Sequence, residues 1–385
     1  MGEAATVDGV VRATTRALRD RFGEHVSIAD ARIVATRERS VTVRCDLAPG
    51  PGVPRSVIAK QNTGDDARGF TDWASLAFLS ALEGTRGVAP GFYGGDVRAR
   101  LFVMEDLGGS RTLADLLATR DWAALPGVLR SLAGTMARLV VATAGPAREA
   151  RYGRLRAELP GAAELGRQAE ANRWLASWPR AAAWFRALDC PAGEACADEV
   201  ARVAQVYAEP GPFLAFSHGD PAPTNNHVGP SSTRLLDFEY GAYRHALYDV
   251  TGWYVLCPLP ETWLAALHGT FREHLARDGA LSVDEEGYGA AWAAICAYRA
   301  LAILGWLPLD IVDEDRPWAE EWTMRGALLT AATRLGRATA GPGGLSALSE
   351  AGSQLARAAR RRWPELGSGL PWWSEGANPP HPQGG

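Results

Sequence analysis

The chain has 385 residues, a net charge of −4, 47% hydrophobic residues and 22% charged residues. This length predicts two or three domains with room for a large core, and the composition is ordinary for a soluble globular protein. The near-balanced charge argues against a protein that binds nucleic acid through a general basic field, so we expect no nucleic-acid partner.

Targeting signals are also absent from the sequence pattern. No apolar run approaches the length needed to span a bilayer, and the residues after Met1 do not form a signal-peptide pattern. We therefore expect no membrane partner. The five cysteines are scattered and form no Cys-x-x-Cys pair, which favours small buried residues in a reducing, cytoplasmic compartment.

The usage of basic residues is uneven. Of the 40 lysines and arginines, 39 are arginines and one is a lysine, Lys60. A compact ammonium and a planar guanidinium differ in shape and hydration, so a single retained lysine suggests a position where arginine does not serve. A chance surface lysine is the alternative.

The first part of the chain is rich in strand patterns. Helical spacing of apolar residues predicts a helix over 6–22, and β-branched runs predict strands. The further expected elements are strands over 28–36, 41–47, 55–60, 91–97 and 101–104, and an amphipathic helix over 70–82. This block predicts a small antiparallel sheet with one helix inserted after its third strand.

The later part is mostly helical. We expect helices over 112–188 and 248–363, interrupted at 307–316, with a β-rich segment at 213–238 between them. The change of character at 105–110 predicts a boundary between a lobe of residues 1–107 and a lobe of residues 108–363, with a ligand cleft between the lobes. Residues 364–385 form a Pro- and Gly-rich tail that we expect to be poorly ordered.

The most specific stretch is Ser217–Glu239, which reads SHGDPAPTNNHVGPSSTRLLDFE. Phosphoryl transfer to an alcohol needs a carboxylate beside the attacking hydroxyl and oxygen ligands for Mg²⁺. Protein kinases carry these groups in H-R-D-x-x-x-x-N and D-F-G, and this stretch carries H-G-D-x-x-x-x-N and D-F-E. A polar turn alone explains the Gly, Pro, Asp and Asn residues. It does not explain His218 or a carboxylate, Asp237, directly after an apolar strand.

These motifs resemble those of the aminoglycoside phosphotransferase and choline kinase-like superfamily. The resemblance covers the chain from Ile28 to about Asp249 and weakens over the last hundred residues. It implies an α+β, two-lobed, protein-kinase-like fold, with a small antiparallel-sheet N-terminal lobe and a larger, mostly helical C-terminal lobe. It also implies ATP or GTP and Mg²⁺ as cofactors, and a small-molecule acceptor as partner.

The resemblance assigns roles position by position. Asp220 is the expected catalytic base, and Asn225 and Asp237 are the expected Mg²⁺ ligands. His218 is expected to brace the loop, and Asp249, in Tyr248-Asp249-Val250, is expected to support it from further along the chain.

Lys60 ends Val57-Ile58-Ala59-Lys60 on the third expected strand, where kinases carry the lysine that contacts the nucleotide phosphates. Active kinases pair this lysine with a carboxylate on the following helix. The matching position here is Asp72, where the superfamily usually has Glu. We favour pairing, and a surface acid near the start of a helix is the alternative.

Three further segments complete the expected nucleotide site. The glycine-free segment Arg37–Ser40 lies where a phosphate-covering loop is expected, and Ser40 could bind phosphate there or belong to an ordinary hairpin turn. The segment Val103–Leu107 resembles the superfamily's hinge. The expected nucleotide-site residues are therefore Lys60, Asp72, Ser40, Met104, Glu105 and Leu107, with core packing an equal alternative for Met104.

The acceptor site is less well defined. Acidic residues suit a cationic acceptor such as an aminoglycoside, and aromatic faces suit a quaternary amine. The candidates are Asp310, Asp313, Glu314, Asp315, Glu320 and Glu321, the tryptophans Trp253, Trp306, Trp318 and Trp322, and also Glu239. A solvated acidic loop beside core tryptophans is the simpler explanation.

The sequence thus predicts a small-molecule kinase whose acceptor is aminoglycoside-like, an amino alcohol or a sugar. A catalytically inactive nucleotide-binding or scaffolding relative is the alternative, because Asp72 replaces Glu and the phosphate loop lacks glycine. A protein kinase is less favoured, because the loop carries Gly219 and no A-P-E motif follows.

Overall fold

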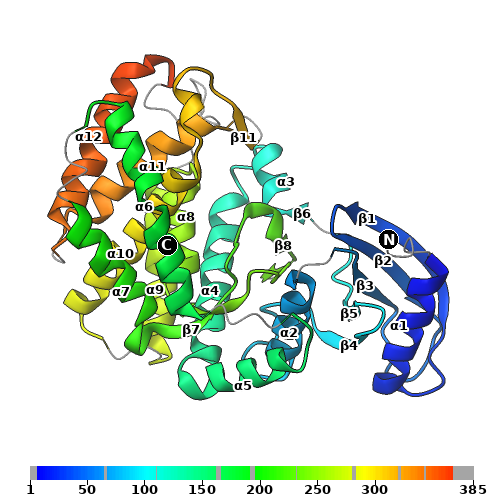
Figure 1. Ribbon diagram of the computed structural model, residues 1–385. Helices are drawn as coiled ribbons and strands as arrows, with labels where there is room; N and C mark the ends of the chain where they lie inside the picture. Colours follow the sequence, from blue (N-terminus) through cyan, green and yellow to red (C-terminus); the bar gives the residue numbers. More distant parts are fainter. Residues whose placement is uncertain are drawn as a thin grey trace. The chain divides into compact units, whose positions relative to one another are not determined.

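The computed structural model describes residues 7–64, 67–109, 111–161, 166–190, 196–230, 232–279, 283–319, 322–341 and 344–366. The chain divides into two compact units (Figure 1). The first unit comprises Met1–Leu113, Pro146–Glu164 and His218–Ala242. The second comprises Ala114–Gly145, Leu165–Ser217 and Tyr243–Gly385.

The first unit is built on a five-stranded antiparallel sheet of order β1-β2-β3-β5-β4. Its sheet elements and the two helices associated with them are α1 (Val7–Phe22), β1 (Ile28–Arg37), β2 (Ser40–Leu47), β3 (Ser56–Asn62), α2 (Arg68–Ser80), β4 (Phe92–Asp96) and β5 (Leu101–Glu105). The expected helix, the five strands and the helix inserted after the third strand are therefore confirmed.

Alternation along the strands separates two faces of this sheet. Val43, Val57 and Ala59 are fully buried and pack with Ala13 and Leu18 of α1 in one core. Because successive side chains of a strand point to opposite faces, Lys60 projects away from the face that α1 covers.

The same unit also contains later parts of the chain. They are α5 (Pro146–Ala157), the one-turn helix η3 (Pro223–Asn225), and a three-stranded sheet of β6 (Arg111–Thr112), β8 (Asn226–Val228) and β9 (Thr233–Leu235), in the order β6-β8-β9. Helix α2 packs on α5, where Phe78 and Tyr152 lie edge to face with ring centroids 5.4 Å apart. Asn226 pairs with Leu235, so the segment that follows His218 runs beside the one that leads to Asp237.

The second unit is mostly helical, as the sequence predicts. Its elements are α3 (Leu113–Ala118), α4 (Leu125–Thr143), α6 (Arg167–Ala187), α7 (Ala197–Ala208), η2 (Gly211–Phe213), β7 (Leu214–Ser217), β10 (Ala242–His245), α8 (Tyr248–Leu256), α9 (Glu261–Arg277), α10 (Glu285–Trp306), η4 (Leu309–Val312), β11 (Pro317–Ala319), β12 (Trp322–Thr323), α11 (Met324–Ala338), α12 (Ser346–Arg362) and η5 (Pro364–Leu366). The predicted α+β class is confirmed.

Two helices of this unit, α4 and α10, are long and apolar enough to cross a membrane by length and composition alone. Their most apolar 18-residue windows are 56% and 61% buried. The core helices of soluble proteins meet the same two criteria, and α10 contributes residues such as Ile295 and Leu304 that are fully buried.

Candidate active site

Lys60 lies on β3, a strand with a neighbour on each side, where it pairs with Thr42 of β2 and Phe102 of β5. Its Nζ donates hydrogen bonds to Asp72 Oδ2 at 2.7 Å and to Asp237 Oδ1 at 2.6 Å. One carboxylate comes from α2, 12 residues after Lys60, and the other comes from the D-F-E segment, 177 residues after Lys60. The predicted pair between Lys60 and Asp72 is present, and the structure adds Asp237 to it.

Asp72 is almost fully buried, and each of its oxygens has a partner. Its Oδ2 accepts from Lys60, and its Oδ1 accepts at 2.9 Å from the backbone N–H of Phe238. The aspartate therefore reaches Lys60 although its side chain is one methylene shorter than that of a glutamate, and it also holds the residue after Asp237.

Asp237 has an unusual backbone conformation, with a φ of +64°. A residue with a Cβ adopts this left-handed region at a cost of about 1–2 kcal/mol. The cost is offset next to it: Phe238 is fully buried, its N–H is bonded to Asp72, and its ring lies 4.4 Å from that of His218. This backbone turn directs the Asp237 carboxylate toward Lys60.

Burial and the neighbouring charges shift the pKa values of Lys60, Asp72 and Asp237. Burial alone would lower the pKa of Lys60, but the two carboxylates raise it above its ordinary value, so the ammonium stays charged. Burial raises the pKa of Asp72. Burial acts in the same sense on Asp237, but Lys60 and then Arg37 bring the pKa of Asp237 below its usual range. Asp237 is therefore the carboxylate of this pair that stays ionised most readily.

The segment around Asp220 is fixed to the residue before Asp237. His218 Nε2 lies 2.7 Å from the carbonyl oxygen of Leu236, and His218 Nδ1 accepts from the backbone N–H of Asp220 at 3.2 Å. The backbone N–H of Leu236 donates to the carbonyl oxygen of Asn225 at 2.8 Å. Asn225 Nδ2 donates to the backbone oxygen of Asp220 at 3.0 Å. His218 thus braces this loop, as the sequence predicts.

Gly219 is required where it stands in this loop. Its φ is +87°, and a Cβ there would lie 2.3 Å from the carbonyl oxygen of Tyr240. No side chain larger than hydrogen fits at that distance. The glycine of H-G-D therefore lets the loop that carries Asp220 pass close to the chain that follows Glu239.

The two expected Mg²⁺ ligands carry donor atoms of a suitable kind. Asp237 and Asn225 supply carboxylate and amide oxygens, which are hard ligands. Among the residues that the structure describes, no group of three or more His, Cys, Asp or Glu side chains forms a metal cage. Two oxygen donors are what a site needs when nucleotide phosphates and waters complete the shell of Mg²⁺.

A cavity of about 230 Å³ opens beside Lys60, lined also by Ser40, Phe102, Asp237 and Glu239. Ser40, expected as a nucleotide contact, therefore lies at this cavity. Arg37 and Arg39, for which the sequence predicted no individual role, line it too. Their position in the glycine-free segment before Ser40 was the sequence feature that could have indicated a place at this cavity.

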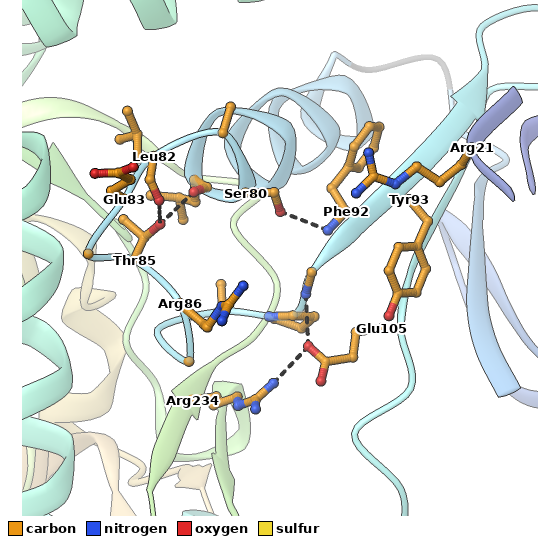
Figure 2. Close-up of a pocket in the computed structure, with 17 residues that line it drawn as sticks. Arg21, Ser80, Leu82, Glu83, Thr85, Arg86, Phe92, Tyr93, Glu105 and Arg234 are labelled. Atoms are coloured by element: carbon orange, nitrogen blue, oxygen red, sulfur yellow. Dashed lines mark hydrogen bonds and ion pairs between the residues drawn. The ribbon is translucent and has the colours of Figure 1, made fainter. Parts of the chain in front are cut away.

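The expected hinge residues lie at the end of β5 and beyond, and they do not line this cavity. Met104 pairs with Ile58 and Phe92 inside the sheet. Figure 2 shows that the Glu105 side chain lies in a different cavity, where it is bonded to Arg234. Leu107 is half-buried after the strand. None of the three is among the residues that line the cavity beside Lys60, and their contact with a nucleotide stays a prediction.

That second cavity is larger, about 850 Å³, and is lined by the loop after α2, β4, Arg21 and Arg234. Glu105 Oε2 accepts from Arg234 at 2.8 Å and from the backbone N–H of Gly91 at 3.0 Å (Figure 2). Its lining residues include none of Lys60, Asp72 and Asp237. The smaller cavity, and not the larger one, is therefore the candidate for phosphate chemistry.

The acceptor candidates lie in the second unit, except Glu239. Trp306, Trp318 and Trp322 form a chain of contacts with ring centroids 4.9 and 5.4 Å apart, and Trp306 is 61% exposed. Trp253 is buried in the core, which favours a packing role. Asp310 is paired with Arg316.

The remaining acidic candidates also include both paired and exposed side chains. Asp315 accepts from the backbone N–H groups of Arg316 and Arg325. Asp313 and Glu314 are exposed, and Glu320 and Glu321 lie outside the described residues.

Asp249, which was expected to support the loop, is buried in the first turn of α8.

Comparisons with known proteins give matches of structure only. No family model and no curated protein sequence matches the chain. Similar solved structures include an ethanolamine kinase from Plasmodium vivax, with 12% identity, a TM-score of 0.44, and coverage of 80% of this chain and 81% of that one. Choline kinase LicA from Streptococcus pneumoniae has 12% identity and a TM-score of 0.43, covering 84% and 97%.

An aminoglycoside phosphotransferase, APH(4)-Ia, solved in a ternary complex with ADP and hygromycin B, has 16% identity and a TM-score of 0.43, covering 85% of this chain and 99% of that one. These are the kinds of protein that the sequence motifs resemble. Similarity at this level assigns no activity and no residue role to the chain.

Proposed function

We propose that the chain is a cytoplasmic small-molecule kinase that moves the γ-phosphate of ATP or GTP, bound with Mg²⁺, to a hydroxyl group of a small acceptor. The observation that carries the proposal is the Lys60 ammonium between Asp72 of α2 and Asp237 of the D-F-E segment, at 2.7 and 2.6 Å. A lone surface lysine would have no reason to be ordered by two carboxylates from distant parts of the chain.

The proposed reaction is an in-line displacement at the γ-phosphorus. Asp220 orients the acceptor hydroxyl and takes its proton, while a new bond forms from the acceptor oxygen to phosphorus. The bond from phosphorus to the bridging oxygen breaks, which leaves ADP or GDP and a phosphate ester. Asn225 and Asp237 would hold Mg²⁺, which supplies neutralisation of phosphate charge.

Lys60 acts in this proposal as a point charge on the phosphates nearest the nucleoside. Asp72 keeps it in place: its two hydrogen bonds, to Lys60 and to the N–H of Phe238, link the lysine to the D-F-E segment. Tightly held donors and charges stabilise a transition state better than mobile ones, because little reorganisation remains at the moment of reaction.

The experiment is an acceptor screen that reads ADP or GDP release with aminoglycosides, choline, amino alcohols and sugars. The matched variants are Asp220→Asn and Asp20→Asn, the latter an exposed aspartate of α1 in the same unit. We expect at least one acceptor to stimulate release, with a loss of about 10²-fold or more in Asp220→Asn and no change in Asp20→Asn.

An inactive relative would give a different result. It would bind nucleotide without turnover on any acceptor, and Asp220→Asn would leave both properties unchanged. That outcome would refute the kinase proposal.

A further inference from the structure

We infer that Arg37 and Arg39 form a guanidinium clamp for the terminal phosphate of the nucleotide, in place of a glycine-rich loop. The inference rests on the proposed function and deepens it, because it names the residues that distinguish a nucleoside triphosphate from a diphosphate. The two arginines lie at the junction of β1 and β2, where Arg37 pairs with Ser40 and only Glu38 and Arg39 form the turn.

The turn lacks the glycines that let a backbone approach phosphate closely. Glycine-rich loops bring backbone N–H groups close to phosphate because no Cβ intervenes. Here both turn residues carry long charged side chains, and no glycine occurs in the segment Arg37–Ser40. The positive charge available to cover a phosphate at this position is therefore that of the Arg37 and Arg39 side chains.

The base of the turn is anchored. The carbonyl oxygen of Arg39 accepts from the backbone N–H groups of Thr63 and Gly64, at 2.9 and 3.4 Å, just after the strand that carries Lys60. A Cβ on Gly64 would meet the Arg39 side chain at 3.2 Å. The turn is thus held beside the end of β3, while its arginine side chains extend from a fixed backbone.

Both side chains reach the carboxylates of the D-F-E segment, about 200 residues away in sequence. Arg37 Nη1 lies 3.3 Å from Asp237 Oδ2, the oxygen opposite the one that Lys60 binds. Arg39 Nη2 lies 3.5 Å from Glu239 Oε1. Lys60 and Arg37 therefore flank one carboxylate, within reach of the same phosphate chain.

The contacts of Arg37 with Asp237 and of Arg39 with Glu239 are easily replaced by contacts with phosphate. Their distances are long for charge-assisted hydrogen bonds, and the side chain of Arg37 is 68% exposed. Exposed ion pairs of this kind contribute little to stability. Phosphate oxygens are matched to the fork of a guanidinium, which binds them through two parallel N–H groups. A bound triphosphate therefore attracts both arginines away from Asp237 and Glu239.

The test is calorimetric titration of Mg·ATP and Mg·ADP into the wild type, Arg37→Gln, Arg39→Gln and the control Arg32→Gln. Arg32 is exposed on the same strand and does not line the cavity. We expect each clamp variant to bind ATP about tenfold more weakly and ADP within about twofold of the wild type. Arg32→Gln should bind both nucleotides as the wild type does. All variants should have the melting temperature of the wild type.

Two results would overturn the clamp alone: a wild type that binds ATP while both arginine variants bind it equally well, or variants that lose ATP and ADP affinity to the same extent. The second result assigns the arginines to general structure of the site. A wild type that binds neither ATP nor GTP would refute the proposed function, and the clamp with it.

Discussion

Asp72 and Phe238 are joined by a hydrogen bond of 2.9 Å from the backbone N–H of Phe238 to Asp72 Oδ1. This bond ties α2 to the segment that carries Asp237, and the second oxygen of Asp72 holds Lys60. One buried carboxylate of α2 therefore connects β3 to a segment that lies 166 residues beyond Asp72 in the chain.

Substitution of Asp72 should destabilise the first unit to a degree that depends on what replaces it. Asp72→Ala removes both acceptors from a buried position and should lower the free energy of unfolding by about 3 kcal/mol. Asp72→Asn keeps an oxygen for Phe238 and should lower it by about half as much. Urea denaturation measures both values, and equal losses in the two variants would show that the bond to Phe238 contributes nothing.

Lys60→Arg should inactivate the protein although it keeps the charge. A planar guanidinium does not fit where two carboxylates approach a single nitrogen at 2.7 and 2.6 Å. We expect a fall of about 10²-fold or more in kcat/KM for phosphate transfer, with Arg55→Lys, an exposed position next to β3, as the control. An active Lys60→Arg variant would refute a specific need for lysine.

Gly219→Ala should disturb the loop that carries Asp220. The added Cβ would lie 2.3 Å from the carbonyl oxygen of Tyr240, whereas Gly52 has a similarly positive φ of +70° and open space around it. Gly52→Ala should therefore cost only about 1 kcal/mol of stability, and Gly219→Ala should cost clearly more and abolish activity. Similar melting temperatures and activities in the two variants would contradict the close approach.

Acid should destabilise the second unit through His245. This histidine is buried, stacks on Phe213 with ring centroids 4.6 Å apart, and accepts through Nδ1 from the backbone N–H of Leu247. Burial lowers its pKa to about 3. The unfolded chain, with an ordinary histidine pKa near 6.5, therefore binds more protons than the folded one between those two values, so stability is present above pH 6.5 and is lost as the pH falls.

At pH 5 the loss from His245 alone should be about 2 kcal/mol. His245→Asn, which keeps an acceptor for Leu247, should reduce the difference in unfolding free energy between pH 7 and pH 5 by about that amount. An unchanged difference would show that the imidazole is protonated in the folded state.

The pair of Lys60 and Asp72, which the structure contains, could be predicted because its signals are local. Lys60 ends an alternating strand, Asp72 falls in the next helix, and the spacing from Asp220 to Asn225 is fixed within one loop. The sheet, the inserted helix and the helical region could likewise be predicted from the periodicity of apolar residues. The two-residue strands β6 and β12 and the four-residue strand β10 are too short for alternation to be detected.

The parts that could not be predicted depend on contacts across long sequence separations. Arg37 meets Asp237 only because the chain returns after 200 residues, and no local pattern in Arg37–Ser40 specifies that. The positive φ of Asp237 is likewise imposed by the partners of Phe238. The side chain of Glu105 faces Arg234, a residue of β9, whereas the hinge pattern by itself suggested the nucleotide side.

Because Lys60 is the only lysine of the chain, one labelling experiment tests the central claim directly. An ATP derivative that carries an acyl group on its terminal phosphate delivers that group to an amine lying against the phosphates, and intact mass with peptide mapping locates the product. We predict acylation of Lys60 that excess Mg·ATP prevents. Acylation of the N-terminal amine alone, or acylation of Lys60 that excess Mg·ATP does not prevent, would contradict the assignment of this site to nucleotide phosphates.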